Sequence, residues 1–395
     1  MRMSRESQTD PASFLWIDDA AGHRDPAALF EELISQFTRE RQYASVFNAR
    51  LMQTRLALGL PLMSQPTIAD VPAPLQAQYQ NGYIEAAREV GALFLGDGNI
   101  AAAWPYFRAI GDTKPIADAI DAFDAGETSS PESAERLSTV VQIAFQEGAH
   151  PKKGFELMLK HYGMCRAVTM FAAYPETNGR EESLQLLVRA LHAEIVENLK
   201  HAISSVEGTA PETESIPVLV AHRDWLFEHN AQYTDTSHLV ALLKFCGDLD
   251  DRSALAQAVE LAAYGCHLGA MFQYNDDPPF ERGFEDRHVY LRALAGEDVD
   301  AAVAHFTAKA EAGALEYGDT RPAEVLVELL IRLDRPGQAI QAFKQFLGGV
   351  PPEQLSCPTL LQLCEMAGDF EQLKQVAQQQ SDPLSYLAAS IRAKA

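Results

Sequence analysis

Apolar residues recur at helical spacing along most of this chain. After Asp25-Pro26, a typical helix start, they fall on one face from Ala28 to Phe37, and a second such face runs from Tyr43 to Leu58. We find no sustained alternation of apolar and polar residues. Val218–Val220 is the one short candidate strand. The pattern predicts an all-α fold.

A spaced set of small and aromatic residues repeats near the C-terminus. Ala339 and Phe343 are followed 34 residues later by Leu373 and Ala377, and Gly368 opens the turn before this second pair. A looser copy, Ala302 and Phe306, lies 37 residues before the first pair. A fixed period of this length is typical of stacked helical hairpins, which cannot bury their apolar faces alone.

Residues 77–111 carry the same kind of pattern. We expect Gly91 to lie where two helices touch, because a larger side chain would hold them apart, and Gly98 to form the turn. Ala103 should pack on the first helix, and Phe107 and Ile110 should fill the groove toward the next hairpin. Pro105 is expected in the first turn of the second helix, where proline is tolerated.

These segments, about residues 77–115 and 288–390, resemble the tetratricopeptide repeat, with Phe94 at the usual tyrosine position. The resemblance implies a right-handed superhelix of helix pairs, an α-solenoid. It also implies a concave groove that binds a peptide or protein segment. The region between the two segments resembles no family.

Polar breaks divide the chain into four predicted parts. Residues 1–25 are expected to be disordered, and 26–130 to form N-terminal helices with one tetratricopeptide-like hairpin. Residues 131–279 are expected to form an irregular, histidine-rich helical block, and 280–395 the C-terminal hairpins. The breaks are Gly126–Pro131 and Asn275–Pro279.

The formal charge of −23 makes nucleic acid and membrane surfaces poor candidate partners, because both are anionic. The N-terminus lacks the apolar core of a secretory signal, and the five cysteines show no paired zinc spacing. We therefore expect reduced thiols and a cytoplasmic location.

Ten of the eleven histidines fall between His150 and His305, most of them in the middle block. Glu194, Glu197 and His201 share a stripe of one predicted helix and could bind a divalent transition metal, but a solvated face with an ordinary glutamate–histidine pair is the plainer explanation. A second candidate metal or catalytic set comprises His222 and His229, seven residues apart on one expected helical face, with Asp235 and His238. Amphipathic packing explains that pair more simply.

A basic patch interrupts the acidic chain between residues 150 and 166. Its lysines and the amide of Gly154, at an expected helix start, could hold a phosphate or carboxylate. The alternative is a loop whose charges offset neighbouring acids. The candidate ligand-binding residues are His150, Lys152, Lys153, Gly154, Lys160 and Arg166.

Aromatic residues from Phe272 to Tyr290 bracket the loop at Pro278-Pro279 and could wall a pocket or cap a join between helical blocks. No phosphate-binding or nucleophile-elbow motif occurs. The interpretation we favour is a non-catalytic protein, without cofactor, that binds a peptide or protein segment. The alternatives are a helical metal-dependent, hydrolase-like enzyme built on the histidine-rich block, and an architectural subunit. The sequence does not specify an oligomeric state.

Overall fold

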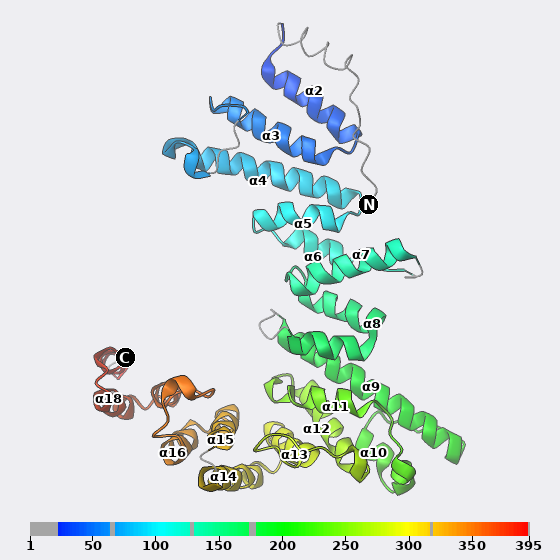
Figure 1. Ribbon diagram of the computed structural model, residues 1–395, viewed down its shortest axis with the longest axis vertical. Helices are drawn as coiled ribbons and strands as arrows, with labels where there is room; N and C mark the ends of the chain where they lie inside the picture. The colour runs from blue at the N-terminus through cyan, green and yellow to red at the C-terminus, as the bar shows by residue number, and fades with distance from the viewer. Residues whose placement is uncertain (1–22, 64–67, 127–129, 174–178, 317–318, 394–395) are drawn as a thin grey trace. The chain divides into compact units, whose positions relative to one another are not determined.

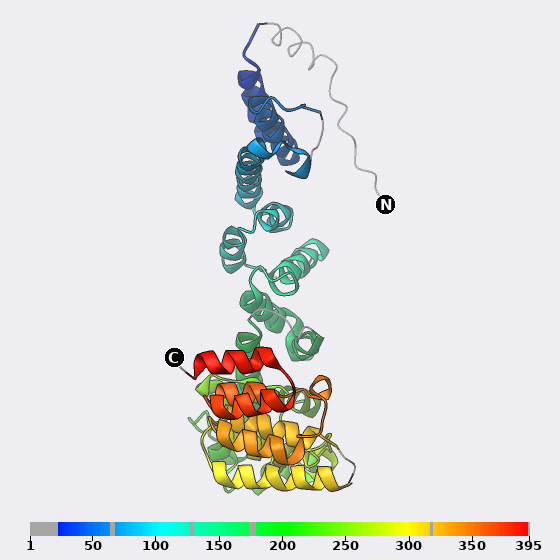
Figure 2. The same cartoon turned by 90° about the vertical axis from the view of Figure 1, so that its left-hand side faces the viewer.

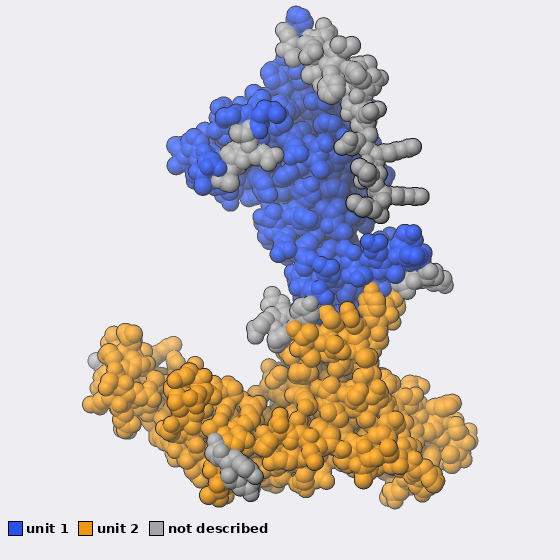
Figure 3. All heavy atoms as spheres, viewed as in Figure 1, with its two compact units in different colours: residues 1–158 blue, residues 159–395 orange. Residues whose placement is uncertain are grey.

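The computed structural model describes residues 23–63, 68–126, 130–173, 179–316 and 319–393, in which the regular elements are all helices and no β-strand occurs. The expected disorder of residues 1–25 concerns mainly positions outside these ranges. Residue contacts divide the chain into two compact units, 1–158 and 159–395 (Figure 3). This boundary lies inside one helix and differs from the predicted breaks near residues 130 and 279. No described helix is both long and apolar enough to cross a bilayer.

The first unit is a series of helices in which, from α2 to α6, neighbours along the chain pack against each other (Figure 1). The two helices expected after residue 25 are confirmed as α2 and α3, and Asp25 caps α2 through the amide of Ala27. The helices are α2 Pro26–Arg39, α3 Tyr43–Ala57, α4 Ala73–Gly96, α5 Ile100–Ala109, α6 Lys114–Asp121 and α7 Pro131–Val141, followed by the π-helical turn η2 Gln142–Gln146 and by α8 Pro151–Ala173, which continues into the second unit.

The α4–α5 hairpin confirms the role predicted for Gly91. A Cβ atom at this position would lie 2.5 Å from Cε2 of Phe107, closer than any real contact. Phe107 is buried, so its ring occupies the space that the missing side chain leaves. Phe107 thus packs inside its own hairpin, whereas we had expected it to face the next one. Pro105 lies in the interior of α5 and not in its first turn.

The second unit contains α9 to α19, and the yellow-to-red helices lie roughly parallel in successive rows (Figure 2). Val218–Val220 belongs to a short helix, so the candidate strand was wrong. The helices of the second unit are α9 Arg180–Glu207, α10 Ile216–Val220, α11 Thr236–Leu243, α12 Arg252–His267, α13 Gly283–Leu294, α14 Val299–Glu316, α15 Arg321–Arg332, α16 Pro336–Phe346, α17 Leu360–Met366, α18 Phe370–Gln379 and α19 Pro383–Arg392. The 3-10 turns η3 Asp224–Asn230 and η4 Cys246–Asp248 lie between them.

The repeated positions lie on every second helix of this unit. Each pair is buried: Ala302 and Phe306 on α14, Ala339 and Phe343 on α16, and Leu373 and Ala377 on α18. The period therefore marks equivalent helices, each of which packs against the helices before and after it.

The turns that precede α16 and α18 are also equivalent. Asp334 and Gly368, 34 residues apart, adopt φ angles of +56° and +67°. In each turn the next residue donates its N–H to the carbonyl five positions earlier, at 2.8 and 2.9 Å. This bond closes the preceding helix, and the left-handed residue reverses the chain. The same backbone turn thus recurs at the period seen in the sequence.

Candidate functional site

The basic patch predicted between residues 150 and 166 is divided by the unit boundary. In the first unit, His150 Nε2 lies 3.0 Å from Oδ2 of Asp121, and Lys152 is exposed. Lys153 Nζ lies 3.7 Å from Oε2 of Glu156. Two of these side chains therefore have acidic partners, as the charge-offset alternative expects.

Gly154 is not a free anion-binding amide. Its N–H donates to the carbonyl of His150 at 3.0 Å, as in a regular helix. A Cβ there would lie 2.7 Å from that of Ala144 and 2.8 Å from the backbone nitrogen of Phe145. Close packing of α8 against η2 explains this glycine.

Lys160 and Arg166 belong to the second unit and are both exposed. Gly163 lies between them with φ +77° and ψ 177°, values that break the helix. The two side chains therefore do not share one continuous helical face.

The stripe of Glu194, Glu197 and His201 lies on α9 as expected. Glu194 Oε1 accepts a hydrogen bond of 2.8 Å from the hydroxyl of Thr234. Glu197 and His201 are exposed. Glu194 therefore binds the chain segment that precedes α11.

The second histidine set is not arranged as predicted. His222 and His229 were expected on one helix, but both adopt left-handed backbone angles, with φ of +61° and +58°. Asp235 caps α11, accepting from the amide of Ser237 at 2.9 Å, and His238 follows in its first turn. Among the described residues, no group of three or more histidine, cysteine or acidic side chains is placed to hold a metal ion.

A cavity of about 330 Å³ lies in the second unit between α13 and α15, beside η4, and we call it the α13–α15 cavity. Four basic side chains line it together with aromatic and aliphatic ones. Its basic residues are Lys244, Arg287, Arg321 and Arg332, its acidic residues are Asp248 and Glu328, and its other side chains include Phe280, Tyr290, Val325, Ile331 and Pro358.

One wall is built around Asp276. Its two carboxylate oxygens accept from Lys244 Nζ at 2.8 Å and from Arg287 at 3.0 Å. Burial raises the pKa of Asp276, but these two cations outweigh it and leave that pKa below its ordinary value. The guanidinium carbon of Arg287 lies 3.8 Å from the centre of the Phe280 ring, in cation–π contact. Arg287 therefore links an ion pair to an aromatic wall.

The opposite wall is α15. Arg332 donates to Oδ1 of Asp250 at 3.0 Å, and Arg321 lies 3.5 Å from Oε1 of Glu328. Burial raises the pKa of Glu328, against the opposing effect of Arg321. Since a guanidinium has five N–H donors, these pairs hold both arginines in place and leave donors for a ligand.

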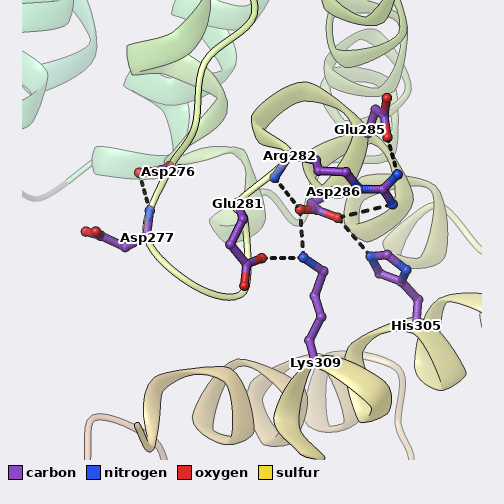
Figure 4. Close-up of polar contacts among 8 residues, drawn as sticks. All are labelled: Asp276, Asp277, Glu281, Arg282, Glu285, Asp286, His305 and Lys309. Atoms are coloured by element: carbon purple, nitrogen blue, oxygen red, sulfur yellow. Dashed lines mark hydrogen bonds and ion pairs between the residues drawn. The ribbon is translucent and has the colours of Figure 1, made fainter. Parts of the chain in front are cut away.

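Asp286 fixes the loop that carries Phe280. It is fully buried on α13 and accepts from the Arg282 amide at 2.8 Å, from His305 at 2.9 Å and from Lys309 Nζ at 2.9 Å. Figure 4 shows Lys309 also paired with Glu281, the residue that follows Phe280 in the chain. Burial raises the pKa of Asp286, and its hydrogen-bonded partners, Lys309 first, lower it below the ordinary value. This cluster joins α13, α14 and the loop that forms the cavity wall.

Part of this cavity was visible in the sequence. The aromatic run around Pro278-Pro279 was expected to wall a pocket or to cap a join between helical blocks. Phe280 and Tyr290 line the cavity, and Tyr274 packs on Phe284 with ring centres 4.8 Å apart. The basic residues gave no signal, because Lys244, Arg287 and Arg332 are far apart in the chain.

Comparison with protein-family models, with curated proteins and with solved structures gave no match to this chain. The resemblance to tetratricopeptide repeats therefore stays a prediction based on its own residues.

Proposed function

We propose that this protein is a helical-repeat interaction protein that binds an acidic peptide or protein segment at the α13–α15 cavity. In this proposal, the hairpins from α13 to α19 belong to a right-handed superhelix of the tetratricopeptide type. The observation that carries the proposal is the grouping of four basic side chains with aromatic walls in a chain of net charge −23.

The cavity suits a carboxylate next to an apolar side chain. Arg321 and Arg332 offer N–H donors, and charge-assisted bonds from guanidinium to carboxylate are the strong ones. Phe280 and Tyr290 offer ring faces to an apolar or aromatic residue. At about 330 Å³ the cavity is large enough for one or two side chains, so the rest of the segment would lie over the neighbouring helices.

Selection of a random dodecapeptide phage library on the immobilised full-length chain tests this function. We expect enriched peptides to carry an acidic residue beside an apolar one. Their affinity should fall about 10-fold in Arg332→Gln, in line with the loss of one charge-assisted hydrogen bond.

Arg335→Gln is the matched control. Arg332 and Arg335 have side chains that are each 30% exposed, and each is paired with one aspartate, but only Arg332 lines the cavity. Equal loss of binding in both variants, or enrichment of peptides without acidic residues, would refute the proposal.

The metal-dependent enzyme suggested by the histidine-rich block is not our proposal. Its two residue sets are not brought together into a metal-binding group within the described ranges.

A further inference from the structure

A second surface of different character lies in the first unit, between α5 and α7. Two hollows of about 640 and 420 Å³ occur there, and Ala101 and Thr139 line both of them. Because they share these residues, the two hollows adjoin, and we call them together the α5–α7 groove. It is larger than the cavity of the second unit and is formed by different helices.

The groove has an apolar floor. Trp104 on α5 and Ile143 on η2 line it and are 6% and 4% exposed as whole residues, and Ala101 and Pro105 complete the α5 wall. Pro105 has no amide hydrogen, so the carbonyl of Ala101 lacks its usual helical donor, and both residues face the groove. The opposite wall runs into the π-helical turn η2, a conformation that is frequent at functional sites.

Acidic side chains dominate the charged positions of the groove. Four carboxylates line it, from Asp97, Glu132, Glu135 and Glu147, against two arginines, Arg108 and Arg136. Glu147 accepts from Trp104 Nε1 at 2.5 Å and from Arg108 at 2.9 Å, so its charge is already compensated. Arg136 lies against the ring of Phe123, with its guanidinium carbon 5.3 Å from the ring centre.

Glu132 and Glu135 differ from these groups. Both are exposed, on the first turns of α7, and neither forms an ion pair with another described residue. They line the hollow that adjoins the apolar one, and the two arginines of the groove contact Glu147 and Phe123 instead. This arrangement attracts a cation that is attached to an apolar segment.

We propose that the α5–α7 groove binds a basic, amphipathic peptide segment of a protein partner. The apolar side chains of the segment lie against Trp104, Pro105 and Ile143, and its lysine or arginine side chains pair with Glu132 and Glu135. This site is independent of the α13–α15 cavity and has the opposite charge preference.

Trp104 provides a local reporter for the test. The chain has three tryptophans, so Trp16→Phe with Trp225→Phe leaves Trp104 alone in an otherwise full-length protein. The probes are two synthetic 14-residue helical peptides with the same leucine positions, one with lysine and one with glutamate at every other polar position. We expect the lysine peptide to bind and to change the Trp104 emission, and the glutamate peptide to do neither.

Charge variants separate groove binding from general attraction to an acidic protein. In Glu132→Gln/Glu135→Gln, affinity for the lysine peptide should fall about 3- to 30-fold, the effect of losing two exposed ion pairs. The control is Glu40→Gln/Glu85→Gln, which removes two exposed carboxylates of the same unit that do not line the groove. This control should bind like the parent chain.

Equal losses in the two double variants would show attraction to the net charge alone and would overturn the proposal. Binding without a change in Trp104 emission would also overturn it. Arg332→Gln should leave binding of the lysine peptide unchanged, so failure at one site is distinguishable from failure at the other.

Discussion

Replacing Asp286 by asparagine should destabilise the second unit strongly. Asp286 is fully buried and accepts three hydrogen bonds, from the Arg282 amide, His305 and Lys309, at 2.8 to 2.9 Å. Asparagine has nearly the same shape but no charge, and its amide group turns a donor toward groups that already donate. The substitution therefore tests the ion pair and not the packing.

The size of the effect follows from the burial. Breaking a buried ion pair by removing one partner costs about 3–5 kcal/mol, because the other charge stays buried. Here Lys309 keeps its contact with Glu281, and the asparagine oxygen can still accept from the Arg282 amide. We therefore expect the lower end of this range, about 3 kcal/mol.

Hydrogen–deuterium exchange of the full chain measures this effect locally, which matters because two units need not unfold in one step. Amides of α13 and α14 should exchange much faster in Asp286→Asn, while those of α4 and α5 in the first unit serve as the internal reference. Asp300→Asn is the control, since Asp300 on α14 also forms an ion pair, with Arg335, but has a side chain that is 89% exposed. Exchange in α13 and α14 that is the same in both variants would refute the argument.

The stabilisation that the Asp286 carboxylate provides depends on pH, and the shift of its pKa sets the direction. The pKa of Asp286 is lower in the folded chain than its ordinary value. Its contribution to stability is therefore complete above the pKa of an unfolded aspartate, about 3.9, and is lost as the pH falls through the folded value. The difference in stability between Asp286→Asn and the parent chain should shrink in this acidic range.

Three further predictions concern packing, a second carboxylate and metal. In urea denaturation, Gly91→Ala should destabilise the first unit by about 0.5–2 kcal/mol, because overpacking against Phe107 exceeds the gain in helix propensity. The control Gly96→Ala, whose added Cβ would have nothing within 4 Å, should be neutral or stabilising in the same assay. Because burial raises the pKa of Glu328, its contribution to stability is present below the pKa of unfolded glutamate and is lost as the pH rises through the folded value. Glu328→Gln should thus raise the thermal midpoint more at pH 7 than at pH 4, and an equal shift at both would contradict this. Treatment with a chelator should leave the thermal midpoint unchanged, since no metal-binding group occurs among the described residues, and a fall in the midpoint would revive the metalloenzyme alternative.

The helices and hairpin contacts could be predicted because they depend on short-range patterns. An apolar face at helical spacing has to be buried, and this identified α2 and α3 with nearly correct ends. Gly91 was predictable because only the absence of a side chain allows the Phe107 ring so close. The 34-residue spacing correctly placed equivalent buried positions on α16 and α18.

The failures occur where a local pattern was extended across an unseen break. His222 and His229 have helical spacing, but α10 ends at Val220 and Ala221 is already extended, with ψ 126°. Gly154 was expected to offer a free amide, yet the structure shows that this position is a glycine because a side chain would clash with Ala144. Nothing adjacent in the sequence marks either constraint.

The α13–α15 cavity could not be predicted because its walls come from distant segments. Arg332 pairs with Asp250, and Arg287 with Asp276 and Phe280, so its geometry depends on how several helices pack. Only the aromatic part of the wall is concentrated in one short run of the sequence. Charge was noticed around Lys152, where the basic residues are neighbours in the chain.

Photo-crosslinking with a peptide enriched on the full-length chain tests the central claim most directly. The peptide carries a photoreactive residue next to its acidic side chain, and mass spectrometry locates the attachment. The account predicts attachment to segments that line the α13–α15 cavity, at residues 244–248, 280–332 or Pro358, with a lower yield in Arg332→Gln and an unchanged yield in Arg335→Gln. Attachment elsewhere on the chain, or equal yields from all three proteins, would contradict it.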